Sequence, residues 1–103
     1  MNKHINLSEK SKQLNHLSGG HIVLIDRLGM QEKFGQLECA RNIYLVDQNG
    51  AVMWQVNSDF DSDGGPFTNV LDDLGELKAY RWDGGMYKID LNTGFAIPIL
   101  LTK

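Results

Sequence analysis

A glycine-containing turn between two short β-rich segments constrains the fold of this chain more than any other feature. Segments 43–46 and 52–56 are rich in β-branched and aromatic residues and are separated by Asp47-Gln48-Asn49-Gly50. Asn-Gly accepts positive φ angles at low cost, so the pair predicts a tight β-hairpin with positive φ at both residues. The sequence therefore predicts antiparallel strands in this half of the chain.

Further turns of the same kind follow along the chain. They lie at residues 72–75, 83–85 and 91–94. Gly94 suits a bulge at positive φ. Because short connections make consecutive strands antiparallel neighbours, the pattern predicts a mainly β fold. We expect a meander of six or seven strands, curled into a half-barrel or a strongly bent sheet.

The first forty residues give weaker signals. His21–Ile25 is a continuous apolar run, which predicts a central strand buried on both faces. Ser8 is a possible cap for one short N-terminal helix over Glu9–Leu17, where Leu14 and Leu17 would share a face. Residues 28–41 fit a loop, a turn of helix or an edge strand.

Size and cysteine content limit the class of protein. A chain of 103 residues with 42% apolar residues has enough material for a single domain, 1–103. Cys39 is the sole cysteine, so an intramolecular disulfide is excluded and a reducing compartment is favoured. The N-terminus lacks the apolar stretch of a secretory signal, and the longest apolar run is too short to cross a membrane. We expect a cytoplasmic protein without membrane contact.

The charge distribution bears on the choice of partner. Ten Lys and Arg against thirteen Asp and Glu give a net charge of −3, which disfavours nucleic-acid binding. Seven of the acidic residues lie between positions 42 and 77, a segment without Lys or Arg. This acidic 42–77 region predicts a basic protein partner.

Candidate metal ligands and nucleophiles are few. Asp59, Asp61 and Asp63 alternate and precede Gly64, as in the first half of a calcium loop, but the twelfth position is Val70. The alternative is a solvated acidic connector, and we expect no calcium-specific stabilisation. The three histidines (His4, His16 and His21) lack metal-ligand spacing, and nothing local pairs one of them with Cys39. No catalytic, cofactor or metal site is therefore assigned.

The aromatic residues allow two interpretations. They are Tyr44, Trp54, Tyr80, Trp82 and Tyr87. Aromatic residues on a small sheet usually fill the core, although these five could instead line a ligand cleft or face a partner. Strand alternation places Tyr80 and Trp82 on the same face.

A longer pattern of strand and turn residues covers most of the chain. It comprises His21–Ile25, Ile43-Tyr44, Trp54-Gln55-Val56, Gly65-Pro66-Phe67, Tyr80-Arg81-Trp82-Asp83-Gly84, Ile89-Asp90, Thr93-Gly94 and Leu101-Thr102-Lys103. This pattern resembles small uncharacterised bacterial β-meander proteins, some of them carried on mobile gene cassettes. The resemblance implies a fold and no activity.

The C-terminal segment favours self-association. Residues 95–102 are largely apolar on both faces, and Pro98 is typical of an edge strand. A bare apolar edge promotes aggregation, so we expect a homodimer that pairs or packs this strand against its mate. The alternative is that the N-terminal helix covers it.

The absence of a catalytic constellation favours a small non-enzymatic binding or protein-interaction module. One alternative is a small-molecule binder that uses the inside of the curled sheet. Another is an immunity or antitoxin-like protein, and an enzyme fits the sequence least well.

Overall fold

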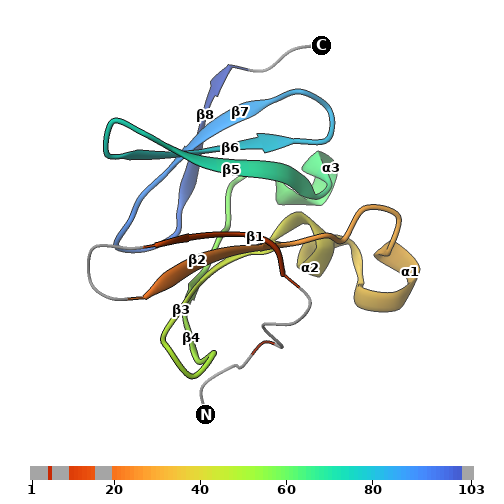
Figure 1. The fold of residues 1–103 in the computed structure, drawn as a ribbon. Helices are drawn as coiled ribbons and strands as arrows, with labels where there is room; N and C mark the ends of the chain where they lie inside the picture. The colour runs from red at the N-terminus through yellow and green to blue at the C-terminus, as the bar shows by residue number, and fades with distance from the viewer. Residues whose placement is uncertain (1–4, 6–9, 16–19, 101–103) are drawn as a thin grey trace.

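Two four-stranded antiparallel sheets face each other in the computed structural model, which describes residues 5, 10–15 and 20–100 (Figure 1). The first sheet has the order β1 (Lys10–Asn15), β2 (His21–Ile25), β3 (Ile43–Val46) and β4 (Val52–Gln55). The second has the order β5 (Phe67–Asp73), β6 (Glu76–Arg81), β7 (Met86–Ile89) and β8 (Ala96–Leu100). The mainly β, antiparallel prediction is confirmed.

Three short helices lie together at one end of this sandwich (Figure 1). Helices α1 (Gln31–Phe34) and α2 (Gln36–Ala40) connect β2 to β3. Helix α3 (Asp61–Gly64) lies in the connection from β4 to β5, which carries the chain from the first sheet to the second. None of the helices in the described part of the chain is long and apolar enough to cross a membrane.

The main core lies between the sheets and takes residues from both. Its buried members are Ile22, Leu24, Ile43, Leu45, Trp54, Val56, Phe67, Val70, Leu77, Ala79, Tyr87, Ile89 and Ala96. The opposite face of β2 is also buried, because Val23 and Ile25 pack with Tyr44 and Val46 in a second cluster. The prediction of a central strand buried on both faces is therefore confirmed.

The predicted strand number and the single curled sheet are wrong in detail. The described residues form eight strands, and the meander is interrupted once, between β4 and β5. A single sheet would expose one of its faces. Dividing the strands into two sheets lets both inner faces bury their alternate apolar residues in one core.

The predicted N-terminal helix is also wrong over Lys10–Asn15, which forms strand β1; Ser8, Glu9, His16 and Leu17 lie outside the described residues. β1 pairs with the otherwise open edge of β2, from Lys10 opposite Ile25 to Asn15 opposite His21. Its burial alternates, with Lys12 and Leu14 turned toward the protein. The backbone hydrogen bonds offered by β2 outweigh the weak local preference for a helix.

The hairpin at Asp47–Gly50 forms as predicted, with a different turn geometry. Gly50 has φ 87°, whereas Asn49 is not among the described residues with positive φ. The Asp47 carboxylate accepts hydrogen bonds from the Asn49 N–H at 2.8 Å and the Ala51 N–H at 2.9 Å. The expectation of positive φ at both residues is wrong: the Gly50 N–H donates to the Asp47 carbonyl at 3.1 Å, and the turn that this bond closes needs the left-handed conformation only at Gly50.

We expect Gly50→Val to lower the free energy of unfolding by at least ~1 kcal/mol, since valine is strained at positive φ. The matched control is Gln48→Val, which places the same side chain at an exposed position of the same turn. Urea denaturation measures both variants. An unchanged midpoint for Gly50→Val would contradict the turn geometry.

Candidate interaction surface

The side chain of Arg81, at the end of β6, is buried at the end of the sandwich that carries the helices. It is 1% exposed. Its guanidinium carbon lies 4.2 Å from the centre of the Phe67 ring and 4.8 Å from that of Tyr87. The two rings meet edge to face at 5.5 Å. The charge therefore lies against aromatic faces, a favourable arrangement once water is excluded.

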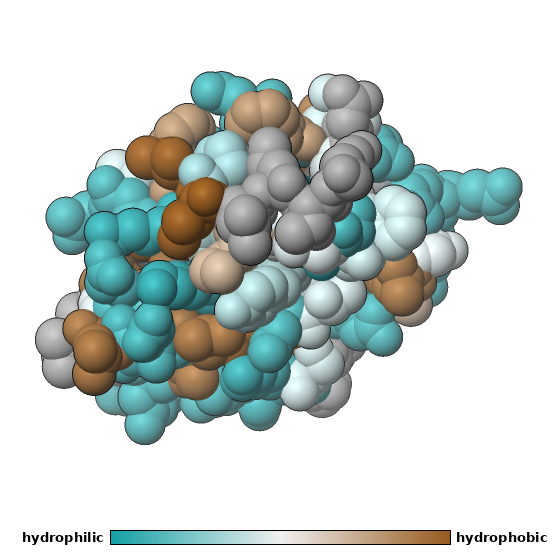
Figure 2. All heavy atoms as spheres, turned by 90° about the horizontal axis from the view of Figure 1, so that it is seen from above, coloured by the Kyte–Doolittle hydropathy of each residue, from teal (hydrophilic) through white to brown (hydrophobic). Residues whose placement is uncertain are grey.

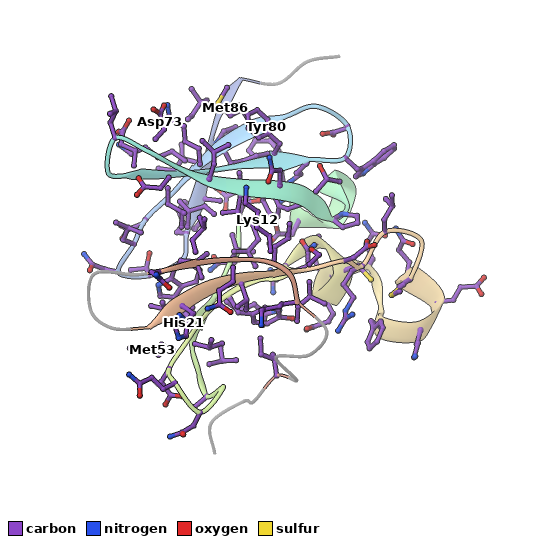
Figure 3. The ribbon with its side chains drawn as sticks, viewed as in Figure 1. Lys12, His21, Met53, Asp73, Tyr80 and Met86 are labelled. Atoms are coloured by element: carbon purple, nitrogen blue, oxygen red, sulfur yellow. The ribbon has the colours of Figure 1, made fainter. Side chains whose placement is uncertain are left out.

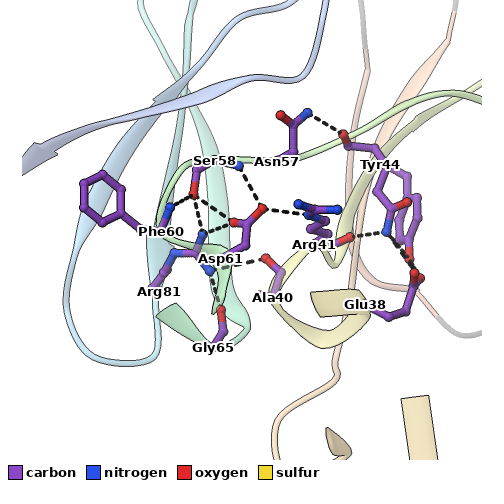
Figure 4. Close-up of polar contacts among 11 residues, drawn as sticks. Glu38, Ala40, Arg41, Tyr44, Asn57, Ser58, Phe60, Asp61, Gly65 and Arg81 are labelled. Atoms are coloured by element: carbon purple, nitrogen blue, oxygen red, sulfur yellow. Dashed lines mark hydrogen bonds and ion pairs between the residues drawn. The ribbon is translucent and has the colours of Figure 1, made fainter. Parts of the chain in front are cut away.

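Hydrogen bonds from Arg81 join three parts of the chain (Figure 4). Nη2 donates to Asp61 Oδ1 at 2.6 Å and to Ser58 Oγ at 3.0 Å. Nη1 donates to the carbonyls of Ala40 and Gly65. One side chain thus ties α2, α3 and the segment before α3 to the second sheet.

Asp61 is the carboxylate partner in this network and is 2% exposed. Its Oδ2 accepts from Arg41 Nε at 2.7 Å and from the Ser58 N–H at 2.9 Å, and Ser58 Oγ donates to Oδ1 (Figure 4). Burial alone would raise the pKa of Asp61, but the hydrogen bonds from Arg41, Ser58 and Arg81 lower it below its ordinary value of 3.8. Asp61 is therefore ionised, and Arg41 and Arg81 balance its negative charge.

Because of this pairing, we expect the protein to lose stability as the pH falls. The pKa of Asp61 is lower in the folded state than in the unfolded state. Its contribution to the free energy of unfolding is therefore complete above the pKa of the unfolded state and is lost as the pH falls through the pKa of the folded state. We expect the difference in unfolding free energy between the native chain and Asp61→Asn to shrink below about pH 4. Urea titrations at several pH values measure it, and a constant difference down to about pH 2 would contradict this.

Two further polar contacts position the β2–β3 connection. Glu38 Oε2, on α2, accepts from the Tyr44 hydroxyl at 2.6 Å, and burial together with this contact raises the pKa of Tyr44. The amide of Asn42 is fully buried and bonds to the Ile25 carbonyl and to both backbone groups of Phe67, at 2.7–2.8 Å. Asn42 therefore links the first sheet to the first residue of the second.

Exposed apolar side chains are present at the end of the sandwich that carries this network. In the described part of the chain nine large hydrophobic side chains are exposed. Five of them belong to the helices, the loops beside them and the turn after β6: Leu28, Met30, Leu37, Phe60 and Trp82. We call these five residues the helical-end surface; Figure 1 shows the elements that carry them at one end of the sandwich.

The exposed fractions of these five side chains range from 38% for Met30 to 58% for Trp82. Trp82 packs over Gly65, where a Cβ atom would lie 2.2 Å from its indole nitrogen. Cations border the surface: the Arg27 guanidinium lies 4.1 Å above the Phe34 ring, and Lys33 lies 5.2 Å from it. The arrangement can bury apolar groups of a partner inside a charged border.

The family model described as "Domain of unknown function (DUF7957)" matches residues 1–98. The chain belongs to this family. No curated protein and no solved structure matches the chain. The stretch matched by the DUF7957 family contains the whole Arg81 network and all five residues of the helical-end surface.

The five aromatic residues considered for a ligand cleft do not come together in this DUF7957 member. Trp54 and Tyr87 belong to the main core and Tyr44 to the second cluster. Tyr80 is half-buried and Trp82 exposed, while Arg81 between them is buried, which agrees with the prediction that Tyr80 and Trp82 share a face. Core packing is thus confirmed for three of the five.

The calcium-loop residues are separated by the same network. Asp61 faces two arginines, Asp59 is exposed, and the Asp63 side chain lies outside what the structure describes. Nowhere in the described ranges do three His, Cys, Asp or Glu side chains gather as a metal site. The oxygens that a cation would need from Asp61 already accept hydrogen bonds. Calcium-independent stability stays a prediction.

The remaining candidates are the Cys39 thiol and the histidines. Cys39 is fully buried on α2, and burial raises the pKa of its thiol. His21 hydrogen-bonds with Gln13 of β1 at 3.1 Å. His4 and His16 fall outside the described residues. A buried thiol with a raised pKa is a poor nucleophile.

The acidic 42–77 region does not form one continuous surface. Asp61, Asp73 and Glu76 are paired with basic side chains. Asp47 lies in the β3–β4 turn, and Asp72 lies near the end of β5. Charge is therefore spread over several turns, and a basic partner stays a prediction.

Sequence reasoning missed both the Arg81 network and the helical-end surface. One signal was available: alternation along β6 places Arg81 on the inner face with Leu77 and Ala79, all three buried. An arginine at a core position needs a buried carboxylate partner. The partner itself could not be chosen from the sequence.

Proposed function

We propose that this chain is a small non-enzymatic module that binds a protein partner through the helical-end surface. The observation that carries the proposal is that five of the exposed large apolar side chains belong to the short helices, their loops and the β6–β7 turn, elements that lie at one end of the sandwich (Figure 1). Soluble proteins rarely expose such groups together unless they meet a partner. Binding residues are also commonly placed on loops that a rigid sheet positions.

The buried network supports this function by holding the surface in place. Arg81 fixes α2 and α3, and Asn42 fixes the chain between α2 and β3. A surface that is ordered before binding loses less conformational entropy when the partner arrives. Trp82 and Arg27 are of the residue types that most often dominate binding energy.

Site-specific photo-crosslinking in the native host tests the proposal. A photoreactive phenylalanine analogue is introduced at Leu37, in the helical-end surface, and at Met53, which is 58% exposed on β4. We expect a discrete cross-linked species of defined mass from position 37 and none from position 53. The matched control separates a specific contact from general reactivity of exposed apolar positions.

Substitution of Trp82 completes the test. Trp82→Ser should abolish the cross-link from position 37 while leaving the unfolding midpoint almost unchanged, since the side chain is more than half exposed. Equal cross-linking from positions 37 and 53, or a species that survives Trp82→Ser, would overturn the proposed surface.

The cellular setting and biological role extend the same proposal. A single buried thiol suits a reducing compartment, and we place the module in the cytoplasm. An immunity or antitoxin-like role is one form that such a module takes. The exposed carboxylates of the 42–77 region suit a basic partner.

A homodimer is a second candidate, favoured by β8. This strand is the last in the second sheet, and Ile97 and Ile99 are 59% and 51% exposed. β1 lies in the other sheet, so the alternative, an N-terminal helix that covers β8, does not form from residues 10–15. Figure 2 shows hydrophobic side chains among hydrophilic ones on the side of the second sheet.

The edge of β8 favours packing over strand pairing. The Phe95 carbonyl accepts from Asp90 on the β7 side, whereas the Ala96 N–H donates to the Asn57 carbonyl at 2.7 Å on the other side. Alternation then directs Pro98, which has no N–H, to the open edge. A second copy is better accommodated on Ile97 and Ile99 than by extending the sheet.

We expect light scattering at micromolar concentration to report about twice the chain mass of 11.6 kDa. Ile99→Lys should return the protein to the monomer mass, because a charge cannot be buried unpaired in an apolar interface. Met53→Lys, on exposed β4, is the matched control. A dimer that survives Ile99→Lys would remove β8 as its cause.

A further inference from the structure

A cavity of about 360 Å³ opens between the two sheets at the end opposite the helices. His21 and Asp73 mark this end in Figure 3. The lining residues come from β1, β2, β5, β6 and the β7–β8 turn: Leu14, Asn15, Ile22, Asp72, Gly75, Leu77, Leu91 and Asn92. Among these described residues four are aliphatic, and the polar ones include a single carboxylate. This size and lining are those of a small-ligand site.

Hydrogen bonds hold the walls of the cavity in place. Asp72 accepts from the Gly75 N–H at 2.8 Å, which fixes the β5–β6 turn. The Leu91 carbonyl accepts from the Trp54 indole at 2.9 Å, and Asp90 accepts from the Asn92 N–H at 2.7 Å. These bonds hold the β5–β6 and β7–β8 turns in place at the cavity without a ligand.

The mouth of the cavity is acidic. A shallower hollow adjoins it and shares Gly75, Leu77 and Leu91; its charged lining residues are Glu76, Lys88 and Asp90. Asp73 and Glu76 form ion pairs with Lys78 and Lys88 at 2.7 Å and 2.6 Å. Asp72 and Asp90 have no ion pair within the described residues, so the mouth has excess negative charge.

We propose that this cavity binds a small amphiphile consisting of an aliphatic chain and a primary ammonium group. The chain lies among Leu14, Ile22, Leu77 and Leu91, and the ammonium lies at Asp72. A cavity of ~150 Å³ holds one benzene molecule, so this larger cavity has room for a six-carbon chain together with its head group. An ammonium suits the mouth because it donates three hydrogen bonds and carries the complementary charge.

Three six-carbon probes that differ only in the head group test the proposal: hexylammonium, hexanol and hexanoate. Methyl NMR titration with the full chain at constant ionic strength reports both site and affinity. We expect saturable shifts of Leu14, Ile22, Leu77 and Leu91, with Val23 and Val46 in the second cluster unmoved. Hexylammonium should bind about fivefold more tightly than hexanoate, the scale of one exposed ion pair.

Asp72→Asn is the decisive variant, because the amide oxygen still accepts from Gly75 while the charge is removed. It should abolish the preference for hexylammonium. Asp59→Asn makes the same change at an exposed position beside α3 and should leave the preference intact.

Equal affinity for all three probes would overturn the role of Asp72. Shifts that never saturate, or that include Val23 and Val46, would overturn the cavity as a binding site. The result is independent of the helical-end surface, which lies at the other end of the molecule.

Discussion

Asp61→Asn is expected to lower the free energy of unfolding by about 3 kcal/mol, the cost of breaking a buried ion pair from one side. The change removes the charge that compensates Arg81 and Arg41. It also replaces one acceptor oxygen by an NH₂ group, which cannot accept from either arginine. Urea denaturation monitored by tryptophan fluorescence measures the loss.

Asp59→Asn is the matched control, two residues earlier and exposed. We expect it to change the unfolding free energy by less than about 0.5 kcal/mol, as usual for an isolated surface position. A loss below about 1 kcal/mol for Asp61→Asn would mean that the carbonyls of Ala40 and Gly65 satisfy Arg81 without a carboxylate. That result would contradict the ionic account of the network.

Gly94→Ala is expected to cost at least about 2 kcal/mol, because backbone strain and a steric clash combine. Gly94 has φ 79°. An added Cβ would lie 2.6 Å and 2.8 Å from two ring atoms of Trp54, and 3.1 Å from the Gln55 carbonyl oxygen. Trp54 is a buried core residue, so its ring has little room to move. Thermal and urea unfolding both report the loss.

Gly29→Ala isolates the contribution of backbone strain. Gly29 has φ 77°, and an added Cβ there meets nothing within 4 Å. We expect it to cost about 1 kcal/mol, the strain alone. Equal losses at positions 29 and 94 would show that the Trp54 ring moves aside without cost.

The strands that the sequence predicted well are those whose partner is local. The β3–β4, β5–β6, β6–β7 and β7–β8 hairpins each join neighbouring segments through a short turn. Turn residues and two-residue alternation are signals that lie within about ten residues of sequence, so they can be recognised without knowledge of the tertiary structure. β1 was missed because its residues favour a strand only once β2 offers an open edge.

The candidate sites depend on residues far apart in the sequence. Arg81 bonds to Ala40, 41 positions away, and to Asp61, 20 positions away. The cavity combines Leu14 of the first sheet with Leu77 of the second. Which buried arginine meets which carboxylate depends on how two sheets stack, and no local pattern encodes that packing.

The backbone hydrogen bonds between Asn57 and the last hairpin connect the unfolding of the two sheets. Asn57, just after the first sheet, donates to the Gly94 carbonyl and accepts from Ala96, so the middle of the chain is tied to its last strand. Neither sheet can separate without exposing the inner face of the other and breaking this tie. We therefore expect the two sheets to unfold together in a single all-or-none transition.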